Sequence, residues 1–218
     1  MDKCKAKQHK PLEKAFYGRD TVKVARELLG KLLVRICDGR LLSGRIVETE
    51  AYLGEGDPGS HAFRGPTPRS STMYGEPGRA YVYFVYGNHC LLNVVTEPRG
   101  KPGAVLIRAL EPVAGIEVMR SRRKAKGLLN GPGKLTQAMS IDMSFNGADM
   151  INGDLFIADD GVRVRRAGVT GRIGLSAGGD LPLRFFIPSN THVSRKAVGT
   201  TEYTENNEES RVDGPAQS

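Results

Sequence analysis

The chain has no tryptophan and only three cysteines among its 218 residues, and the cysteines are far apart. Cys4, Cys37 and Cys90 form no CxxC pair and are odd in number. This pattern excludes a disulfide framework and gives no thiolate metal site. We predict free thiols in a reducing compartment, and neither a metal nor an organic cofactor.

Long hydrophobic runs and phosphate-binding loops are missing as well. No apolar segment reaches the length of a membrane span or of a signal-peptide core, which predicts an intracellular, soluble protein with no membrane partner. The glycine-rich segment NGPGKLTQ, residues 130–137, lacks the GxxxxGK[ST] pattern, so a nucleoside triphosphatase is not indicated.

Basic side chains are in excess. Lys and Arg total 32 against 24 Asp and Glu, which gives a net charge of +8. The segment 194–218 holds 3 of these basic and 5 of these acidic residues, so residues 1–193 carry 29 minus 19, or +10. An excess of this size favours a polyanionic partner such as nucleic acid.

The order of apolar and polar segments predicts one domain. Residues 1–13 and 194–218 are polar and poor in large apolar side chains, so we expect a basic N-terminal arm and a polar C-terminal tail, both flexible, around a domain spanning 14–193. Asp20 is a candidate N-cap for a helix that ends at Gly30. Further helices are expected over 113–127 and 131–139.

The remaining segments read as strands, mostly in hairpins. We expect them over 31–37 and 41–52, joined by an Asp-Gly turn; over 81–86 and 89–95, joined at Gly87-Asn88; and over 103–112, 155–168 and 183–188. Hairpins without regular βαβ alternation predict the α+β class with a mostly antiparallel sheet.

One predicted strand, RIVETEAY (residues 45–52), carries two carboxylates. Its alternation places Glu48, Glu50 and Tyr52 on one face. A solvated face of an antiparallel strand would look the same. The two glutamates could also be the acid and base of a sugar hydrolase, since residues two apart on a strand lie only ~6.6–7 Å apart.

The segment RAYVYFVYGNHCLLN (residues 79–93) concentrates aromatic rings at a hairpin. Tyr81 and Tyr83 point to one face, and Phe84 and Tyr86 point to the other, with Tyr86 beside the turn. Tyr86 is either an exposed turn residue or a wedge that enters a base stack.

Several polar residues are uninformative on their own. His61 stands alone in a loop rich in glycine and proline, with no second ligand at metal-binding spacing, so no metal site is predicted. Asn93, Arg108 and Lys134 are each compatible with an ordinary strand or surface position.

Taken together and in order, four segments resemble the alkyladenine (3-methyladenine) DNA glycosylases. They are RIVETEAYLG, the tyrosine-rich stretch from Thr67 to Asn93, AVLIRALEP and GPGKLTQA, and the resemblance extends from about Phe16 to Pro188. It implies a single α+β domain on a curved, mostly antiparallel sheet with flanking helices. It also implies a monomeric, monofunctional enzyme of base excision repair that removes alkylated or deaminated purines from duplex DNA. Such an enzyme is expected inside the cell with the DNA, in the nucleoid or cytoplasm or in the nucleus, and it needs no metal or organic cofactor.

The resemblance also assigns roles to residues. Glu50 corresponds to the catalytic carboxylate that activates water and Arg108 to a residue beside that water, whereas Glu48 matches no catalytic position. Tyr83 corresponds to one side of a base-binding sandwich, Tyr52 and His61 to its other side, and Asn93 to a contact with the purine edge. Tyr86 corresponds to the wedge that fills the gap left by a flipped base. Contacts to DNA are expected from Thr67, Arg69, Met73 and Lys134.

Two features leave alternatives open. The loop from Gly54 to Pro66 shows little pattern beyond His61, so the breadth of substrates is unassigned. A nucleic-acid-binding module that keeps the fold and the wedge but has lost turnover is the main rival, and the presence of Glu50 beside Tyr52 argues against it.

Overall fold

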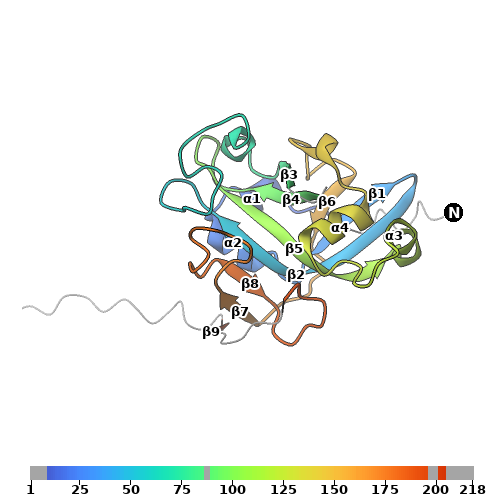
Figure 1. Ribbon diagram of the computed structural model, residues 1–218. Coiled ribbons are helices and arrows are strands. Elements are labelled where there is room, and N and C mark those ends of the chain that lie inside the picture. The colour runs from blue at the N-terminus through green and yellow to red at the C-terminus, as the bar shows by residue number, and fades with distance from the viewer. Residues whose placement is uncertain (1–8, 86–88, 196–200, 205–218) are drawn as a thin grey trace, which may run out of the picture.

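The 13-residue strand β2 (Arg40–Tyr52) is the centre of the fold, because three other strands pair with it. The computed structural model describes residues 9–85, 89–195 and 201–204. These build a nine-stranded sheet that is antiparallel at every pairing and curls around a hydrophobic core (Figure 1). The predicted α+β class is confirmed.

The main path of the sheet runs β3-β4-β5-β2-β8-β7-β9, and β1 joins β2 to β6 beside it. The other strands are β1 (Leu32–Cys37), β3 (Ala80–Val85), β4 (His89–Val95), β5 (Ala104–Ala114), β6 (Leu155–Ala158), β7 (Arg166–Thr170), β8 (Arg184–Phe186) and β9 (Thr201–Thr204). The helices are α1 (Lys14–Tyr17), α2 (Thr21–Glu27), α3 (Ile116–Arg122) and α4 (Pro132–Met139), with 3-10 turns η2 (Ser71–Tyr74) and η3 (Met143–Phe145).

Local signals placed the first elements correctly. The Asp20 side chain accepts a hydrogen bond from the Lys23 amide at 2.9 Å and so caps α2 as predicted. Asp38 and Gly39 both have positive φ, 51° and 69°, as the mirror-image turn of a two-residue hairpin requires. The turn fixes the register of β1 against β2.

Two segments differ from the prediction. Residues 155–168 form two strands, β6 and β7, because the turn residues around Asp159 and Gly161 interrupt the run. The polar tail is not a free arm throughout, since β9 lies within it and pairs with β7. A polar segment can extend a sheet through its backbone hydrogen bonds alone, which a search for apolar side chains does not detect.

The helices cover the sheet and bury its apolar side chains. Leu28, the residue after α2, is completely buried in the core. The same core contains four other completely buried side chains: Leu33 of β1, Ile46 of β2, Ile107 of β5 and Phe185 of β8. Within the described part of the chain no helix is long and apolar enough to cross a membrane. The long connection from β2 to β3, which includes η2, leaves the sheet at one end (Figure 1).

Candidate active site and nucleic-acid interface

An irregularity in the β2–β5 pairing brings an arginine between the two carboxylates. Glu48 pairs with Ala109 and Thr49 with Ile107, so Arg108 is an extra residue in the ladder. Such a bulge changes the direction of a side chain. Arg108 donates from Nε to Glu48 Oε1 at 3.0 Å and from Nη1 to Glu50 Oε2 at 2.9 Å.

Glu48 lies inside the protein, not on a solvated strand face. It is completely buried and accepts hydrogen bonds from Arg108, from Arg184 Nε at 2.7 Å, and from both the amide and the hydroxyl of Ser194, at 2.6 and 2.8 Å. The solvated-face alternative is therefore wrong. None of these donors lines the aromatic cavity described below, whereas Tyr52 connects Glu50 to it, which argues against Glu48 as an acid partner of Glu50 in a sugar hydrolase.

We expect Glu48→Gln to lower the free energy of unfolding by about 3–5 kcal/mol, because it leaves buried guanidinium groups with one carboxylate fewer. Urea unfolding measures the change. Glu117→Gln is the matched control: Glu117 also pairs with an arginine, Arg120 at 3.2 Å, but on the exposed surface. That pair should contribute about 0–1 kcal/mol. Equal losses in the two variants would contradict a structural role for the buried cluster.

Glu50 is held by three donors and connects directly to an aromatic ring. It is completely buried, and its Oε1 accepts the backbone amide of Ile173 at 2.8 Å. Its Oε2 accepts both Arg108 and the hydroxyl of Tyr52, the latter at 2.9 Å. Burial, and then the Glu50 charge, raise the pKa of Tyr52 far above its usual value, so the phenol remains a proton donor to the carboxylate. The orientation of Glu50 is therefore fixed from three sides.

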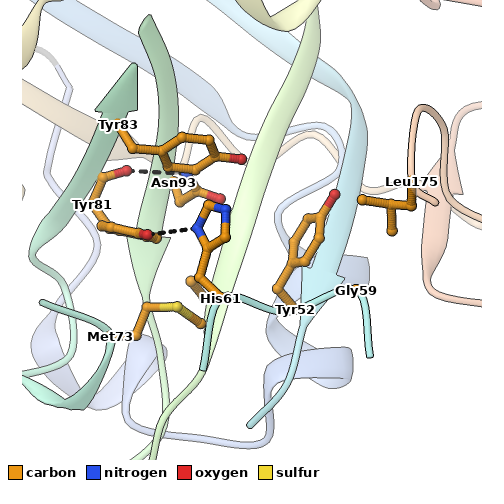
Figure 2. A pocket seen from close by; sticks show the side chains of 9 residues that line it. Tyr52, Gly59, His61, Met73, Tyr81, Tyr83, Asn93 and Leu175 are labelled. Atoms are coloured by element: carbon orange, nitrogen blue, oxygen red, sulfur yellow. Dashed lines mark hydrogen bonds between the residues drawn. The ribbon is translucent and has the colours of Figure 1, made fainter. Parts of the chain in front are cut away.

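Tyr52, which donates to Glu50, also forms one wall of a small cavity with aromatic sides (Figure 2). Its volume is about 50 Å³. The lining side chains come from the sheet and from the β2–β3 connection, with one from the loop before β8: Tyr52, Gly59, His61, Met73, Tyr81, Tyr83, Asn93, Ala104 and Leu175. The structure thus brings together all four predicted base-binding residues, Tyr52, His61, Tyr83 and Asn93, from four separate segments.

His61 lies against the tyrosines of β3 rather than beside Tyr52. Its ring is 4.6 Å from that of Tyr83, edge to face, and its Nδ1 is 2.8 Å from the Tyr81 hydroxyl (Figure 2). The predicted grouping of His61 with Tyr52 on one side of a sandwich therefore differs from the observed arrangement. The reason is the Tyr81–His61 hydrogen bond, which the sequence does not reveal.

The imidazole is neutral in this position. Burial, and then the positive charge of Arg69, lower the pKa of His61 to about 4. Because the native state binds this proton less readily than the unfolded chain, protonation favours unfolding. The contribution of His61 to stability is complete above pH ~6.5, the ordinary pKa of histidine, and is lost as the pH falls through about 4.

We therefore expect the parent protein to lose stability between pH 6.5 and pH 4 partly through His61, and His61→Asn to lose less over the same interval. Melting temperatures at pH 7, 6, 5 and 4.5 measure the difference between the two proteins. Parallel pH profiles would show that His61 is not held neutral by the fold.

Asn93 is fixed by a cross-strand contact. It is buried, stands opposite Tyr81 in the β3–β4 ladder, and donates from Nδ2 to the Tyr81 carbonyl at 3.1 Å. This bond uses one of the two N–H groups of Nδ2 and fixes the plane of the amide, with Oδ1 on the side of His61 (Figure 2). Asn93 thus has a defined orientation at the cavity wall.

The residues expected to contact DNA have different surroundings. Thr67 and Arg69 are exposed; Thr67 forms a turn with Ser70 through hydrogen bonds of 2.9–3.1 Å. Met73 is only 1% exposed and lines the cavity, so its side chain does not lie on the outer surface as a duplex contact would. Lys134 lies in the first turn of α4 and donates to Asn130 at 3.1 Å.

Tyr86, the predicted wedge, lies outside the described residues. The hairpin strands leading to it are described, and the start of β4 packs on α4. A Cβ added at Gly133 would come within 2.9 Å of the His89 ring and Cβ. Because Gly133 has no side chain, α4 can approach His89 at the start of β4 this closely. Lys134, the next residue of α4, therefore lies on the same part of the molecule as the hairpin.

Several residues of the site went unrecognised in the sequence. Asp57 and Arg172 form a buried ion pair, with Arg172 Nη1 at 2.7 Å from Asp57 Oδ2, and Ser194 and Arg184 complete the Glu48 cluster. The sequence predicts Tyr81 to be an aromatic strand residue, but it gives no sign of the hydrogen bond between Tyr81 and His61. None of the four polar residues belongs to a local motif, because their partners are distant in the chain.

A larger cavity, of about 890 Å³, lies between α2 and the segment 159–167. Its lining includes the ion pair of Lys31 with Asp159 at 2.9 Å. Of its lining residues only Phe16 is aromatic, so it lacks the convergence of aromatic rings that the smaller cavity has. Among the described residues, no group of three or more His, Cys, Asp or Glu side chains could hold a metal ion.

Comparison with known proteins identifies the family. The profile of the methylpurine-DNA glycosylase (MPG) family matches residues 15–191. The chain belongs to the methylpurine-DNA glycosylase family. It is therefore related to enzymes of base excision repair, which act on DNA bases, and the resemblance found from the four motifs is confirmed.

Curated relatives named "Putative 3-methyladenine DNA glycosylase" cover the same region. One from Carboxydothermus hydrogenoformans is 50% identical over 85% of this chain and 99% of its own length. One from Koribacter versatilis is 44% identical over 90% of this chain and 99% of its own. One from Methanocella arvoryzae is 46% identical over 86% of this chain and 98% of its own length. Membership of this family makes the chain a DNA glycosylase of base excision repair.

Proposed function

We propose that this glycosylase, acting as a monomer, flips alkylated or deaminated purines out of duplex DNA and hydrolyses their N-glycosidic bond with a water that Glu50 activates. The substrates would be of the 3-methyladenine, hypoxanthine and ethenoadenine class, and the product an abasic site. The observation that carries the proposal is the 2.9 Å hydrogen bond from Tyr52 to Glu50, which joins the aromatic cavity to the buried carboxylate.

The cavity suits a purine that has left the helix. Extruding a base costs a few kcal/mol of unstacking and unpairing, and stacking on aromatic side chains recovers part of it. Tyr52 and Tyr83 are the rings available for stacking, and His61 and Asn93 the polar groups beside them. The cavity is narrow because His61 lies against Tyr83, so entry of a base would require the His61 ring to shift.

The buried charges suit the reaction. As the bond to the base breaks, the sugar acquires oxocarbenium character, which a fixed carboxylate stabilises, and the attacking water must give up a proton, which the same carboxylate can accept. Arg108, anchored by Glu48, keeps Glu50 in place and offers donors near the water. Ile173 and Tyr52 hold the other sides of the carboxylate.

The test is incubation of the protein with duplexes containing hypoxanthine, ethenoadenine or a methylated purine, followed by detection of abasic sites. We expect excision without strand cleavage, no covalent complex on addition of borohydride, and full activity in EDTA, because water and not a protein amine is the proposed nucleophile. A borohydride-trapped adduct, or binding of lesion DNA without any excision, would contradict the proposal. The second outcome would instead support the binding-module alternative.

A further inference from the structure

Two of the three tyrosines that line the cavity, Tyr52 and Tyr83, have an arginine stacked on the ring. The guanidinium carbon of Arg172 lies 4.7 Å from the ring centroid of Tyr52, and that of Arg69 lies 5.2 Å from the centroid of Tyr83. Neither arginine is among the residues that line the cavity. The two contacts are independent, because Arg172 precedes β8 and Arg69 belongs to the β2–β3 connection.

Each arginine is placed by contacts of its own. Arg172 is held by Asp57 at 2.7 Å, by the carbonyl of Ala51 at 3.0 Å and by that of Gly178 at 2.9 Å. Gly59 permits this arrangement, since a Cβ there would lie 2.6 Å from an Arg172 nitrogen. Arg69 is exposed and has no carboxylate partner among the described ion pairs.

The charge of Arg69 is felt inside the aromatic cluster. It contributes to the low pKa of His61, after burial, and it opposes the rise that burial causes in the pKa of Tyr81 to about 12. A cation on one face of a ring also weakens the attraction of the opposite face for a second cation, because both draw on the same quadrupole. The rings of Tyr52 and Tyr83 therefore attract a cationic base less strongly than tyrosine rings without a stacked arginine would.

We propose that Arg69, acting through Tyr83, gives the base pocket a positive potential that favours departure of the base, whereas Arg172, whose charge is balanced by Asp57, holds the ring of Tyr52 in place. The proposal rests on the glycosylase function proposed above. When the glycosidic bond breaks, its electron pair leaves with the purine, and the proton of the attacking water goes to Glu50. A cationic alkylated purine thereby becomes neutral, and Glu50 later releases its proton to solvent. A neutral purine leaves as an anion that takes up one proton from solvent, which balances the proton that Glu50 releases.

In both cases the base becomes more negative, so a positive potential lowers the energy of the transition state relative to the bound substrate. Binding in the ground state is affected differently. A cationic base is bound less tightly than it would be without the guanidinium groups, whereas a neutral base is bound almost equally well. Arg69 is in this sense a residue that tunes rate and specificity without touching the reacting atoms.

Arg69→Gln is the direct test, because Arg69 is exposed and its loss leaves the buried Asp57–Arg172 pair intact. Single-turnover rates are measured at saturating enzyme on matched duplexes with hypoxanthine, which is neutral, and 7-methylguanine, which is cationic. We expect both saturated rates to fall about threefold to tenfold, the range that cation–π and oriented electrostatic effects of this size allow. Affinity for the 7-methylguanine duplex should rise relative to that for the hypoxanthine duplex.

Two control variants, Arg64→Gln and Arg69→Lys, test whether the charge of Arg69 sets the rate. Duplex affinities and the activity of the parent protein test the alternatives. Arg64→Gln removes an exposed arginine of the same loop and should leave the saturated rates unchanged. Arg69→Lys keeps the charge and should keep most of the rate; a loss equal to that of Arg69→Gln would overturn the proposal, provided both variants melt like the parent. Unchanged saturated rates with an equal loss of affinity for all duplexes, lesion or not, would show that Arg69 is only a phosphate contact. Absence of excision by the parent would refute the proposed function itself.

Discussion

Glu50→Gln is expected to bind a lesion-containing duplex about as well as the parent and to excise the base at least a hundredfold more slowly, the order of magnitude lost with a general base. The amide keeps the size of the side chain and an oxygen for the Ile173 amide or the Tyr52 hydroxyl, which now meet the carboxylate at 2.8 and 2.9 Å. What it loses is the negative charge and the ability to take a proton. Single-turnover excision at saturating enzyme isolates this step from binding.

Glu48→Gln is the internal control for this assignment. Glu48 is just as buried but faces Arg184 and Ser194, away from the aromatic cavity. Its substitution should reduce stability, as argued above, while the correctly folded fraction retains far more activity than Glu50→Gln. Equal losses of single-turnover rate in the two variants would mean that the base has been assigned to the wrong residue.

Asn93→Ser is expected to raise excision of guanine, or of its alkylated forms, relative to hypoxanthine by about tenfold to a hundredfold. An aromatic sandwich accepts any purine face, so guanine must be rejected at the edge of the base. Asn93 is fixed by its bond to the Tyr81 carbonyl and cannot move aside to admit an exocyclic 2-amino group. Forcing an extra group into a packed site costs roughly 1–3 kcal/mol, which corresponds to about this range of ratios.

The structure narrows how this discrimination would work. The bond from Nδ2 of Asn93 to the Tyr81 carbonyl fixes the plane of the amide and keeps Oδ1 on the side of His61 (Figure 2). Oδ1 is an acceptor, so crowding of the amino group, not the lack of an acceptor, is the expected cause of rejection. Matched single-turnover rates on guanine and hypoxanthine duplexes decide the matter. A ratio that stays at the parent value, with both rates lower, would make Asn93 a structural strand residue and leave selectivity to the loop around His61.

Local features of the fold could be predicted from the sequence because their causes are local. Asp20 caps the helix next to it, and the Asp38-Gly39 turn fixes the hairpin that carries Glu48 and Glu50. The alternation of β3 placed Tyr81 and Tyr83 on one face, as their tilted ring contact at 5.3 Å confirms. In each case the residues that decide the structure are within a few positions of one another.

The contacts that organise the site could not be predicted, because they join distant segments. The Ile173 amide reaches Glu50 from 123 residues away, and Ser194 reaches Glu48 from 146 residues away. The bulge at Arg108 depends on how β2 and β5 align, and no feature of β5 alone announces it. Single arginines such as Arg172 carry no signal that distinguishes a solvated side chain from one stacked on a ring.

The most direct test of the account is the structure of the Glu50→Gln variant bound to a duplex containing hypoxanthine. We expect the hypoxanthine to lie outside the helix in the cavity between Tyr52 and Tyr83, with His61 displaced from its present contact with Tyr83 and the sugar carbon facing the Gln side chain. A hypoxanthine that remains stacked in the duplex, or duplex DNA bound along α2 and the segment 159–167 with the aromatic cavity empty, would contradict it.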